Sequence, residues 1–321
     1  MADQSALSSR AIIGTYYRLL EMDTGVAWVD KISNIFGSDQ SSEEYAFLGM
    51  PPALQEWIGG RQIKSLNSNS ITLTNVHYEA GIEIRVKDAR RDKTGQINAR
   101  LAELVERQQS HWATLLSALI NAGETDNGYD GKTFFATDHV EGANSTSQSN
   151  NISVDISAIP AEVTSSDGTT TNPTVGEMQG AINQCVAQMI GFVDDQGEPM
   201  NQNANQFLLM VNPGLWPAAV AATSLMNTGA MVQNVNPNTM PGMIVNPVMN
   251  TRITATDAIY LFRTDSAIKP LIRQTEMDSQ LKSKAEGSEF EFDNDAWQFG
   301  IDSWRTTGYG YWQHAVRGEL D

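Results

Sequence analysis

The sequence predicts an α+β fold, in which helices and strands occupy different stretches of a 321-residue chain. Residues 95–122 repeat apolar side chains at the spacing of a long amphipathic helix. Residues 61–87 alternate apolar and polar side chains, which is typical of β-strands. The last quarter of the chain returns to short segments of strand type. Because 40% of the residues are hydrophobic, the chain can bury a sizeable core.

The first part of the chain predicts an extended arm followed by a β-hairpin. Residues 1–42 hold a short helical pattern at 10–22 but no sustained periodicity. Residues 61–87 predict a long hairpin with few large apolar side chains, so we expect it to lean on another surface. The alternating apolar residues are Ile71, Leu73, Ile82, Ile84 and Val86.

Two helices are predicted in the middle of the chain. The first covers 95–122, between Gly95 and a stop signal at Gly123, and would be roughly 40 Å long. The second covers 175–190, where Thr174 can serve as the N-cap.

A small α/β unit and a group of strands complete the fold. The unit consists of a buried strand at 207–211, a helix near 215–225 and a strand at 243–245. The remaining predicted strands are 258–262, 290–292, 296–303 and 309–316.

Charge is distributed unevenly along this acidic chain, whose net charge is −17. Residues 61–110 carry 9 bases and 6 acids, a net charge of +3. We therefore expect the predicted hairpin to dock on an acidic surface. Its cations are Arg61, Lys64, Arg85 and Lys87.

The 53 residues from Pro199 to Thr251 contain no charged side chain. A soluble monomer normally spreads charge over its exposed surface. The stretch is therefore either buried inside one subunit or faces copies of itself, where a repeated charge would repel. Under the second interpretation, Gln233 and Asn236 are the residues that we expect nearest the point of convergence.

Motifs for catalysis, cofactors and metals are weak. Gly131-Lys132-Thr133 resembles the end of a phosphate-binding loop, but Asp126 stands where that loop needs Gly. Asp138-His139 could form half of a catalytic pair, although no plausible nucleophile accompanies it. We therefore expect no enzyme activity, no cofactor and no metal site. The four histidines are interpreted as structural: His77, His111, His139 and His314.

Cysteine and hydrophobicity patterns indicate the compartment. The single cysteine, Cys185, excludes an intramolecular disulfide. The longest clean apolar run, 215–222, is far shorter than the ~20 residues of a spanning helix. The first residues lack a signal-peptide pattern. We expect a soluble protein that is made in a reducing cytoplasm.

Two of the seven tryptophans stand in segments without clear periodicity. Trp28 and Trp57 are therefore candidate interface anchors, whereas the others are expected to pack in the core.

Four blocks of sequence resemble the Mu-like phage major head subunit family. The first block comprises Glu44-Tyr45-Ala46-Phe47-Leu48-Gly49 and Glu56-Trp57-Ile58-Gly59-Gly60-Arg61, and the second is the mid-chain run from Tyr129 to His139. Ile268-Lys269-Pro270-Leu271-Ile272-Arg273-Gln274 and Gly308-Tyr309-Gly310-Tyr311-Trp312-Gln313 form the third and fourth. The blocks occur in the family's order.

The resemblance implies the Hong Kong 97-type capsid fold, with an arm, an E-loop hairpin, a peripheral (P) domain with a spine helix, and an axial (A) domain. We expect five segments: arm 1–60, E-loop 61–94, P domain 95–173, A domain 174–255, and C-terminal P-domain strands 256–321.

The resemblance also implies a function: the major capsid protein of a tailed double-stranded DNA phage, which assembles with itself into hexamers and pentamers. Expected partners are a scaffold protein, a portal and possible decoration proteins, with DNA enclosed but not bound by sequence. The expected location is the virion capsid, assembled in the host cytoplasm. Two alternatives remain: a nanocompartment shell of the same fold, and a hydrolase on a new α/β fold.

Overall fold

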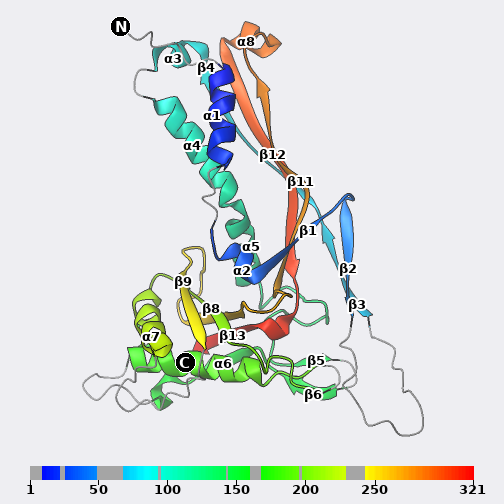
Figure 1. The fold of residues 1–321 in the computed structure, drawn as a ribbon, viewed down its shortest axis with the longest axis vertical. Helices are drawn as coiled ribbons and strands as arrows, with labels where there is room; N and C mark the ends of the chain where they lie inside the picture. The colour runs from blue at the N-terminus through cyan, green and yellow to red at the C-terminus, as the bar shows by residue number, and fades with distance from the viewer. Residues whose placement is uncertain are drawn as a thin grey trace.

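The structure is a computed structural model, and the subunit is elongated along one axis (Figure 1). Two β-sheets follow one another along that axis, and each supports its own hydrophobic core. The residues that the structure describes are 9–21, 26–48, 68–92, 95–141, 144–159, 168–194, 197–228 and 243–321.

One half of the subunit is built on a four-stranded sheet. Helices α1 (Ser9–Glu21) and α4 (Gln96–Gln109) pack together and help to bury its apolar side chains, Ile84 and Phe299 among them. Two short helices, α3 (Val86–Arg91) and α8 (Glu289–Asn294), lie at the far end (Figure 1). The strand order is β1 (Ser33–Gly37), β11 (Leu271–Lys284), β12 (Ala296–Tyr309) and β4 (Val76–Arg85).

The other half is built on a five-stranded sheet. Helix α6 (Val175–Ile190) contacts β13 and β10, and α7 (Trp216–Thr228) contacts α6 and the edge strand β9. The strand order is β7 (Asn151–Val154), β13 (Ala315–Leu320), β10 (Ala258–Arg263), β8 (Gln206–Val211) and β9 (Ile244–Met249).

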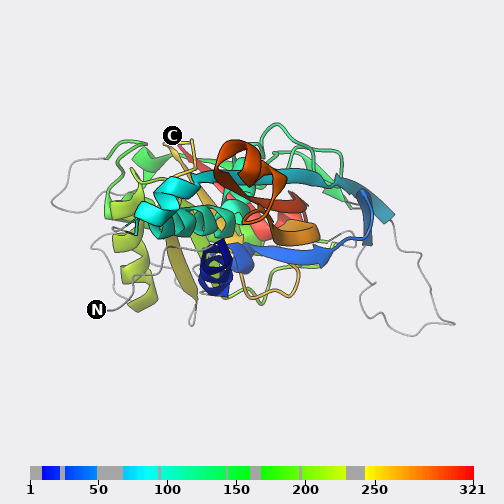
Figure 2. The same cartoon turned by 90° about the horizontal axis from the view of Figure 1, so that it is seen from above.

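The remaining elements connect or extend the two halves. Strands β2 (Ser42–Leu48) and β3 (Ser68–Thr74) form a two-stranded ribbon on the side opposite α7 (Figures 1 and 2). The others are α2 (Val29–Ile32), α5 (His111–Asn121), β5 (His139–Glu141), β6 (Asn144–Gln148) and the 3₁₀ turns η1 (Ile156–Ala158) and η2 (Trp312–His314).

Several sequence predictions are confirmed. Helix α6 begins at the predicted cap, because the Thr174 hydroxyl accepts from the Glu177 N–H and the Glu177 carboxylate accepts from the Thr174 N–H. The buried strand predicted at 207–211 is β8, and the helix and strand predicted after it are α7 and β9.

The predicted hairpin at 61–87 is wrong in its pairing. Strand β3 pairs with the upstream strand β2, and β4 pairs with β12, so the two alternating segments do not pair with each other. Asn75 separates them, and its amide donates to the Gln40 carbonyl at 2.7 Å. Alternation identified both strands, but it shows only which face is buried and not which strand is the neighbour.

The predicted helix at 95–122 is interrupted once. Ser110 ends α4 and precedes α5, while its N–H still bonds the Glu106 carbonyl at 2.9 Å. The Ser110 hydroxyl donates to the Arg107 carbonyl, a local bond that competes with the regular helix pattern. The predicted start and end of the helical region are confirmed, since α4 begins at Gln96 and α5 ends at Asn121. Gly95 is the N-cap, in a left-handed conformation at φ 71°.

Three C-terminal predictions need correction. The strand predicted at 290–292 is the helix α8, whose N-cap Ser288 accepts from the Glu291 N–H. The long strand β11 was not predicted, because polar side chains dominate it after Ile272. The strand predicted at 309–316 is divided by η2 between β12 and β13.

The N-terminal segment is more integrated than an extended arm. Ile12 and Tyr16 of α1 are fully buried, and the Tyr16 hydroxyl donates to Gln108 of α4 at 2.7 Å. Strand β1 joins the sheet in parallel with β11. None of the helices in the described ranges is long and apolar enough to cross a bilayer.

Candidate assembly surfaces and a buried histidine cluster

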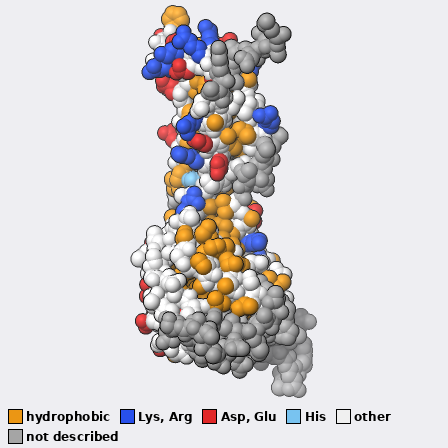
Figure 3. Space-filling model, turned by 90° about the vertical axis from the view of Figure 1, so that its left-hand side faces the viewer, with side chains coloured by type: hydrophobic (Ala, Val, Ile, Leu, Met, Phe, Trp, Pro, Cys, Tyr) orange, Lys and Arg blue, Asp and Glu red, His pale blue; other side chains and the backbone are white. Residues whose placement is uncertain are grey.

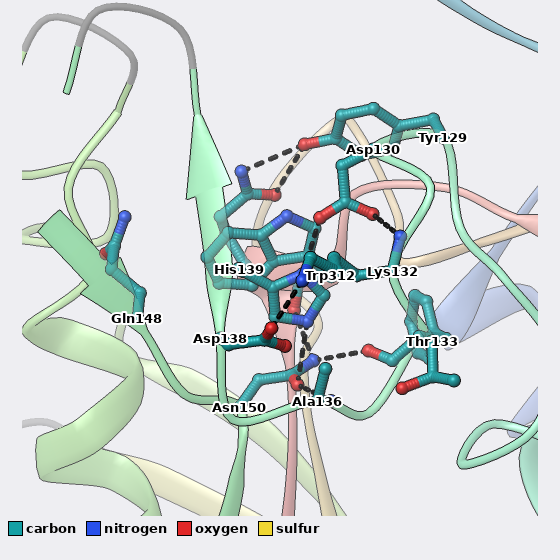
Figure 4. A network of polar contacts seen from close by, with 12 residues as sticks. Tyr129, Asp130, Lys132, Thr133, Ala136, Asp138, His139, Gln148, Asn150 and Trp312 are labelled. Carbon is teal, nitrogen blue, oxygen red and sulfur yellow. Dashed lines mark hydrogen bonds and ion pairs between the residues drawn. The ribbon is translucent and has the colours of Figure 1, made fainter. Parts of the chain in front are cut away.

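A fully buried histidine organises the turn that follows α5. His139 Nδ1 lies 2.5 Å from Oδ2 of Asp130, and its Nε2 lies 3.1 Å from Oδ1 of Asn150. The indole of Trp312 stacks on the imidazole with ring centroids 4.1 Å apart. These four residues, the histidine cluster, come from two distant stretches of the chain, 130–150 and the segment that holds Trp312 (Figure 4).

The partners of Asn150 fix the hydrogen bonds of the cluster. Its Nδ2 donates to the Phe134 carbonyl at 2.7 Å, and its Oδ1 accepts from the Ala136 N–H at 2.9 Å. Oδ1 is therefore an acceptor for His139 Nε2 as well, which must donate. With the Asp130 carboxyl on Nδ1, both ring nitrogens are engaged by protein atoms.

This geometry contradicts a catalytic role for Asp138-His139. Asp138 does not face the imidazole but forms an exposed ion pair with Lys132 (Figure 4). The partner of His139 is Asp130, whose side chain is only 3% exposed. A general base needs a nitrogen within reach of a substrate proton, and neither nitrogen of His139 is available. The arrangement is a structural clamp: buried hydrogen bonds hold the segments around His139 together.

Further bonds extend the clamp toward the C-terminus. The side chain of Gln313 donates to the Tyr129 hydroxyl at 3.0 Å. Asn201 Nδ2 donates to the backbone carbonyls of Gln313 and Met189 at 2.7 and 2.8 Å. The sequence blocks at 129–139 and 308–313 thus meet in one buried network, which sequence reasoning did not connect.

The β2–β3 ribbon is fixed to the body at one end. The Tyr45 hydroxyl donates to Gln274 Oε1 at 2.8 Å, and Gln274 Nε2 donates to Asn75 Oδ1 at 2.8 Å. Leu73 is buried against Gly308, where any side chain would overlap its methyl groups. Two-stranded ribbons are marginal alone, so the part beyond this anchor needs another surface.

An uncharged face covers the α7 and β9 side of the subunit. Hydrophobic and neutral polar side chains dominate its lower half in Figure 3. Strand β9 is the edge of its sheet, and Ile244 and Met249 on it are 44% and 45% exposed. Edge strands that face water are normally protected by charge, and the described residues 199–228 and 243–251 carry none. This face has the character of a surface that a partner covers.

The residues predicted at interfaces lie in different parts of the subunit. Trp28 is buried in the core of its own subunit with 6% exposure, which leaves little surface for a neighbour. Arg85 and Lys87 are exposed, but they lie at the α3 end of the subunit and not on the β2–β3 ribbon. The other five lie outside the described residues: Trp57, Arg61, Lys64, Gln233 and Asn236.

The model of the family described as Mu-like prophage major head subunit gpT matches residues 15–159 and 242–321. These ranges cover more than half of the chain. The chain belongs to this family. The match includes the histidine cluster, the β2–β3 ribbon and the four-stranded sheet.

Individual relatives agree with the family match. The chain is 24% identical over 295 residues to the Mu-like prophage FluMu major head subunit of Haemophilus influenzae, an alignment of 90% of this chain and 66% of that protein. It is 28% identical over 128 residues to the major capsid protein of Escherichia phage Mu, covering 38% of this chain and 42% of that protein. The chain thus aligns with just under two thirds of the length of the FluMu protein and with less than half of the length of the phage Mu protein.

Solved structures share the fold at low sequence identity. The bacteriophage JBD30 procapsid chain superposes with a TM-score of 0.54 and 20% identity, over 97% of this chain and 75% of that one. The mature capsid of bacteriophage PhiM1 gives a TM-score of 0.57 at 10% identity, over 93% and 88%. A virus-like particle from Pyrococcus furiosus superposes with a TM-score of 0.51 and 10% identity, over 95% of this chain and 96% of that one. The fold is the Hong Kong 97-type capsid fold.

Proposed function

We propose that this chain is the major capsid protein of a tailed double-stranded DNA phage and assembles into hexamers and pentamers of an icosahedral shell. The uncharged α7–β9 face carries the proposal, because it is an exposed, apolar sheet edge on a chain of net charge −17. Family membership and the capsid fold support the same function.

The domain assignment follows the strand pairing. We assign the E-loop to residues 42–74, the span of the β2–β3 ribbon, in place of 61–94. The spine helix is α4 with α5, and the A domain is residues 174–255, which include α6, α7, β8 and β9. The four-stranded sheet belongs to the P domain.

The absence of charge suits a position at the capsomer centre. Two like charges ~10 Å apart in water repel by roughly 0.4 kcal/mol, and a ring of six copies contains fifteen pairs. One charge per subunit near the axis would therefore weaken a hexamer by a few kcal/mol before salt screening. An uncharged face avoids this repulsion at every copy.

The work of the protein is assembly and not catalysis. The most tempting catalytic residue, His139, is enclosed in the histidine cluster. We propose as partners other copies of the chain, a scaffold protein and portal during assembly, and decoration proteins on the finished shell. DNA is enclosed without sequence-specific contacts, because a chain this acidic is a poor ligand for phosphate backbones.

A nanocompartment shell is the second candidate, because the Pyrococcus furiosus virus-like particle shares the fold. The two functions differ in what the shell holds. Particles are purified from infected or induced cells, treated with nuclease, and analysed by sedimentation, electron microscopy and extraction of their contents. Closed shells with nuclease-protected double-stranded DNA are expected. Shells loaded with one enzyme would support the nanocompartment, and the absence of shells would refute both.

A further inference from the structure

The α3 end of the subunit carries a group of exposed cations. Arg85 ends β4, and Lys87, Arg90 and Arg91 follow on α3. All four are exposed, and none forms an ion pair with a described residue. We call them the basic patch; Figure 3 shows Lys and Arg side chains gathered at this end.

The same end of the subunit carries an acidic segment. Residues 286–295, the acidic tip, contain five acids and no base, and they include α8. The Glu291 carboxylate accepts from the Gly287 N–H and from Trp297 Nε1–H, and these two bonds lower its pKa. The positive charge of Arg90 in the same subunit lowers this pKa further. The other four acids are exposed and form no ion pair with a described residue: Glu286, Glu289, Asp293 and Asp295.

An exposed aromatic side chain stands in the middle of the acidic tip. Phe292 is 91% exposed, whereas its neighbour Phe290 lies against the Lys284 ammonium. The tip is anchored to its own subunit through the Trp297 bond and through the Asp295 carbonyl, which accepts from the Val86 N–H at 2.9 Å. The anchored tip thus leaves Phe292 almost entirely outside the apolar packing of the described residues.

A groove of about 500 Å³ adjoins the basic patch. It lies between β4 and α4, and its lining includes the apolar Ile82, Ile97 and Leu104 together with Arg85 of the basic patch. No residue of α8 from the same chain lines it. The groove is therefore an apolar binding surface beside the basic patch.

We propose that the acidic tip of one copy docks on the basic patch of a second copy, with Phe292 seated in the β4–α4 groove. The inference rests on the proposed function, and it names a contact between subunits. Each copy carries both halves of the contact on neighbouring elements at one end. The contact can therefore repeat around a ring if the rotation closes, or form twice across a twofold axis. Nucleic acid is a poorer occupant, because the groove lining is balanced and lacks the excess of cations that a phosphate backbone needs. Its charged residues are Glu83, Asp88 and Glu103 with Arg85, Arg100 and Arg107.

Charge reversal with restoration tests the contact in the full chain. Lys87→Glu with Arg91→Glu reverses the basic patch, and Glu289→Lys with Asp293→Lys reverses the acidic tip. Each pair is expected to raise the critical concentration for shell formation about tenfold or more, because like charges then face each other. The four changes together keep the net charge at −17 and restore opposite charges, so assembly should return to within about threefold of the original.

Two further variants make the test specific. Phe292→Ser changes no charge and removes no core contact, and it should also raise the critical concentration about tenfold. Arg10→Glu with Arg18→Glu is the control, because it reverses two exposed cations on α1 and should change assembly much less. Thermal unfolding verifies that every variant is folded.

The outcomes separate this inference from the proposed function. An equal loss in the α1 control, or no recovery when all four charges are reversed, would overturn the docking contact while leaving the capsid function intact. If the unmodified chain forms no shells under any condition, the capsid function itself fails.

Discussion

The imidazole of His139 lies parallel to the indole of Trp312, at an interplanar angle of 6°. Trp312 belongs to η2 near the C-terminus, whereas His139 begins β5 in the middle of the chain. Their stacking closes the histidine cluster and joins two sequence blocks that are 173 residues apart. The cluster is therefore a source of subunit stability.

Asn150→Ala should destabilise the isolated subunit by about 3 kcal/mol. The change leaves the Ala136 N–H and the Phe134 carbonyl buried without their side-chain partner, and each such loss costs about 1–3 kcal/mol. Urea unfolding of unassembled subunit measures the effect. Asp138→Asn is the control, because its ion pair with Lys132 is exposed and little change is expected. Equal stability of the two variants would contradict the structural role of the cluster.

Gly318→Ala should destabilise the subunit by roughly 1–3 kcal/mol through overpacking. A Cβ on Gly318 would lie 2.6 Å from Sγ of Cys185, where β13 approaches α6. Cys185→Ala removes that sulfur, so the double variant should be more stable than the sum of the two single losses predicts. Simple additivity in a thermodynamic cycle would show that the close approach is absent.

His314 should make the subunit less stable in mild acid. Burial, with the positive charge of Arg263, lowers the pKa of His314 to about 4, and Nδ1 contacts the Ile268 carbonyl at 3.1 Å. Asp265 opposes this shift and Lys269 adds to it. In the unfolded chain, His314 binds a proton as the pH falls through about 6.5. In the folded chain, it binds this proton only near pH 4. The free energy of unfolding therefore falls over this window, by up to about 3 kcal/mol.

Comparison with His314→Gln isolates this effect. Unfolding of both proteins is followed between pH 7 and pH 4, and the variant should show a shallower loss. An identical pH dependence would mean that folding does not lower the pKa of His314.

Gln233→Asp with Asn236→Asp should weaken capsomers while leaving the subunit soluble. Both residues lie outside the described ranges but inside the uncharged stretch. Repulsion in a ring of copies amounts to a few kcal/mol per hexamer, and salt screens it with a Debye length of ~8 Å. Sedimentation at low and high salt should show partial recovery. The uncharged control, Gln233→Ser with Asn236→Ser, should assemble normally, and a salt-independent defect would place these residues away from the axis.

Local sequence signals predicted most of the elements because their causes are local. Thr174 and Glu177 carry the cap of α6 within four residues, and the apolar run of β8 is buried where it was expected. Ser288 and Glu291 form a similar signal, Ser-x-x-Glu, at the start of α8. The strand prediction at 290–292 overlooked it.

Long-range relationships were not available from the same signals. Nothing within 68–85 shows that β3 pairs with β2 while β4 pairs with β12. The partners of His139 lie 9, 11 and 173 residues away, and only the fold brings them together. The basic patch was visible as a charge excess, but its distance from the ribbon depends on that strand pairing.

The position of the α7–β9 face in an assembled shell tests the account most directly. Electron cryomicroscopy of purified particles should resolve the strands and show which residues surround the capsomer axes. We predict that Ile244–Met249 and the end of α7 converge there, and that the β2–β3 ribbon lies on a neighbouring subunit. A map in which this uncharged face lies against solvent, away from every symmetry axis and neighbouring copy, would contradict the account.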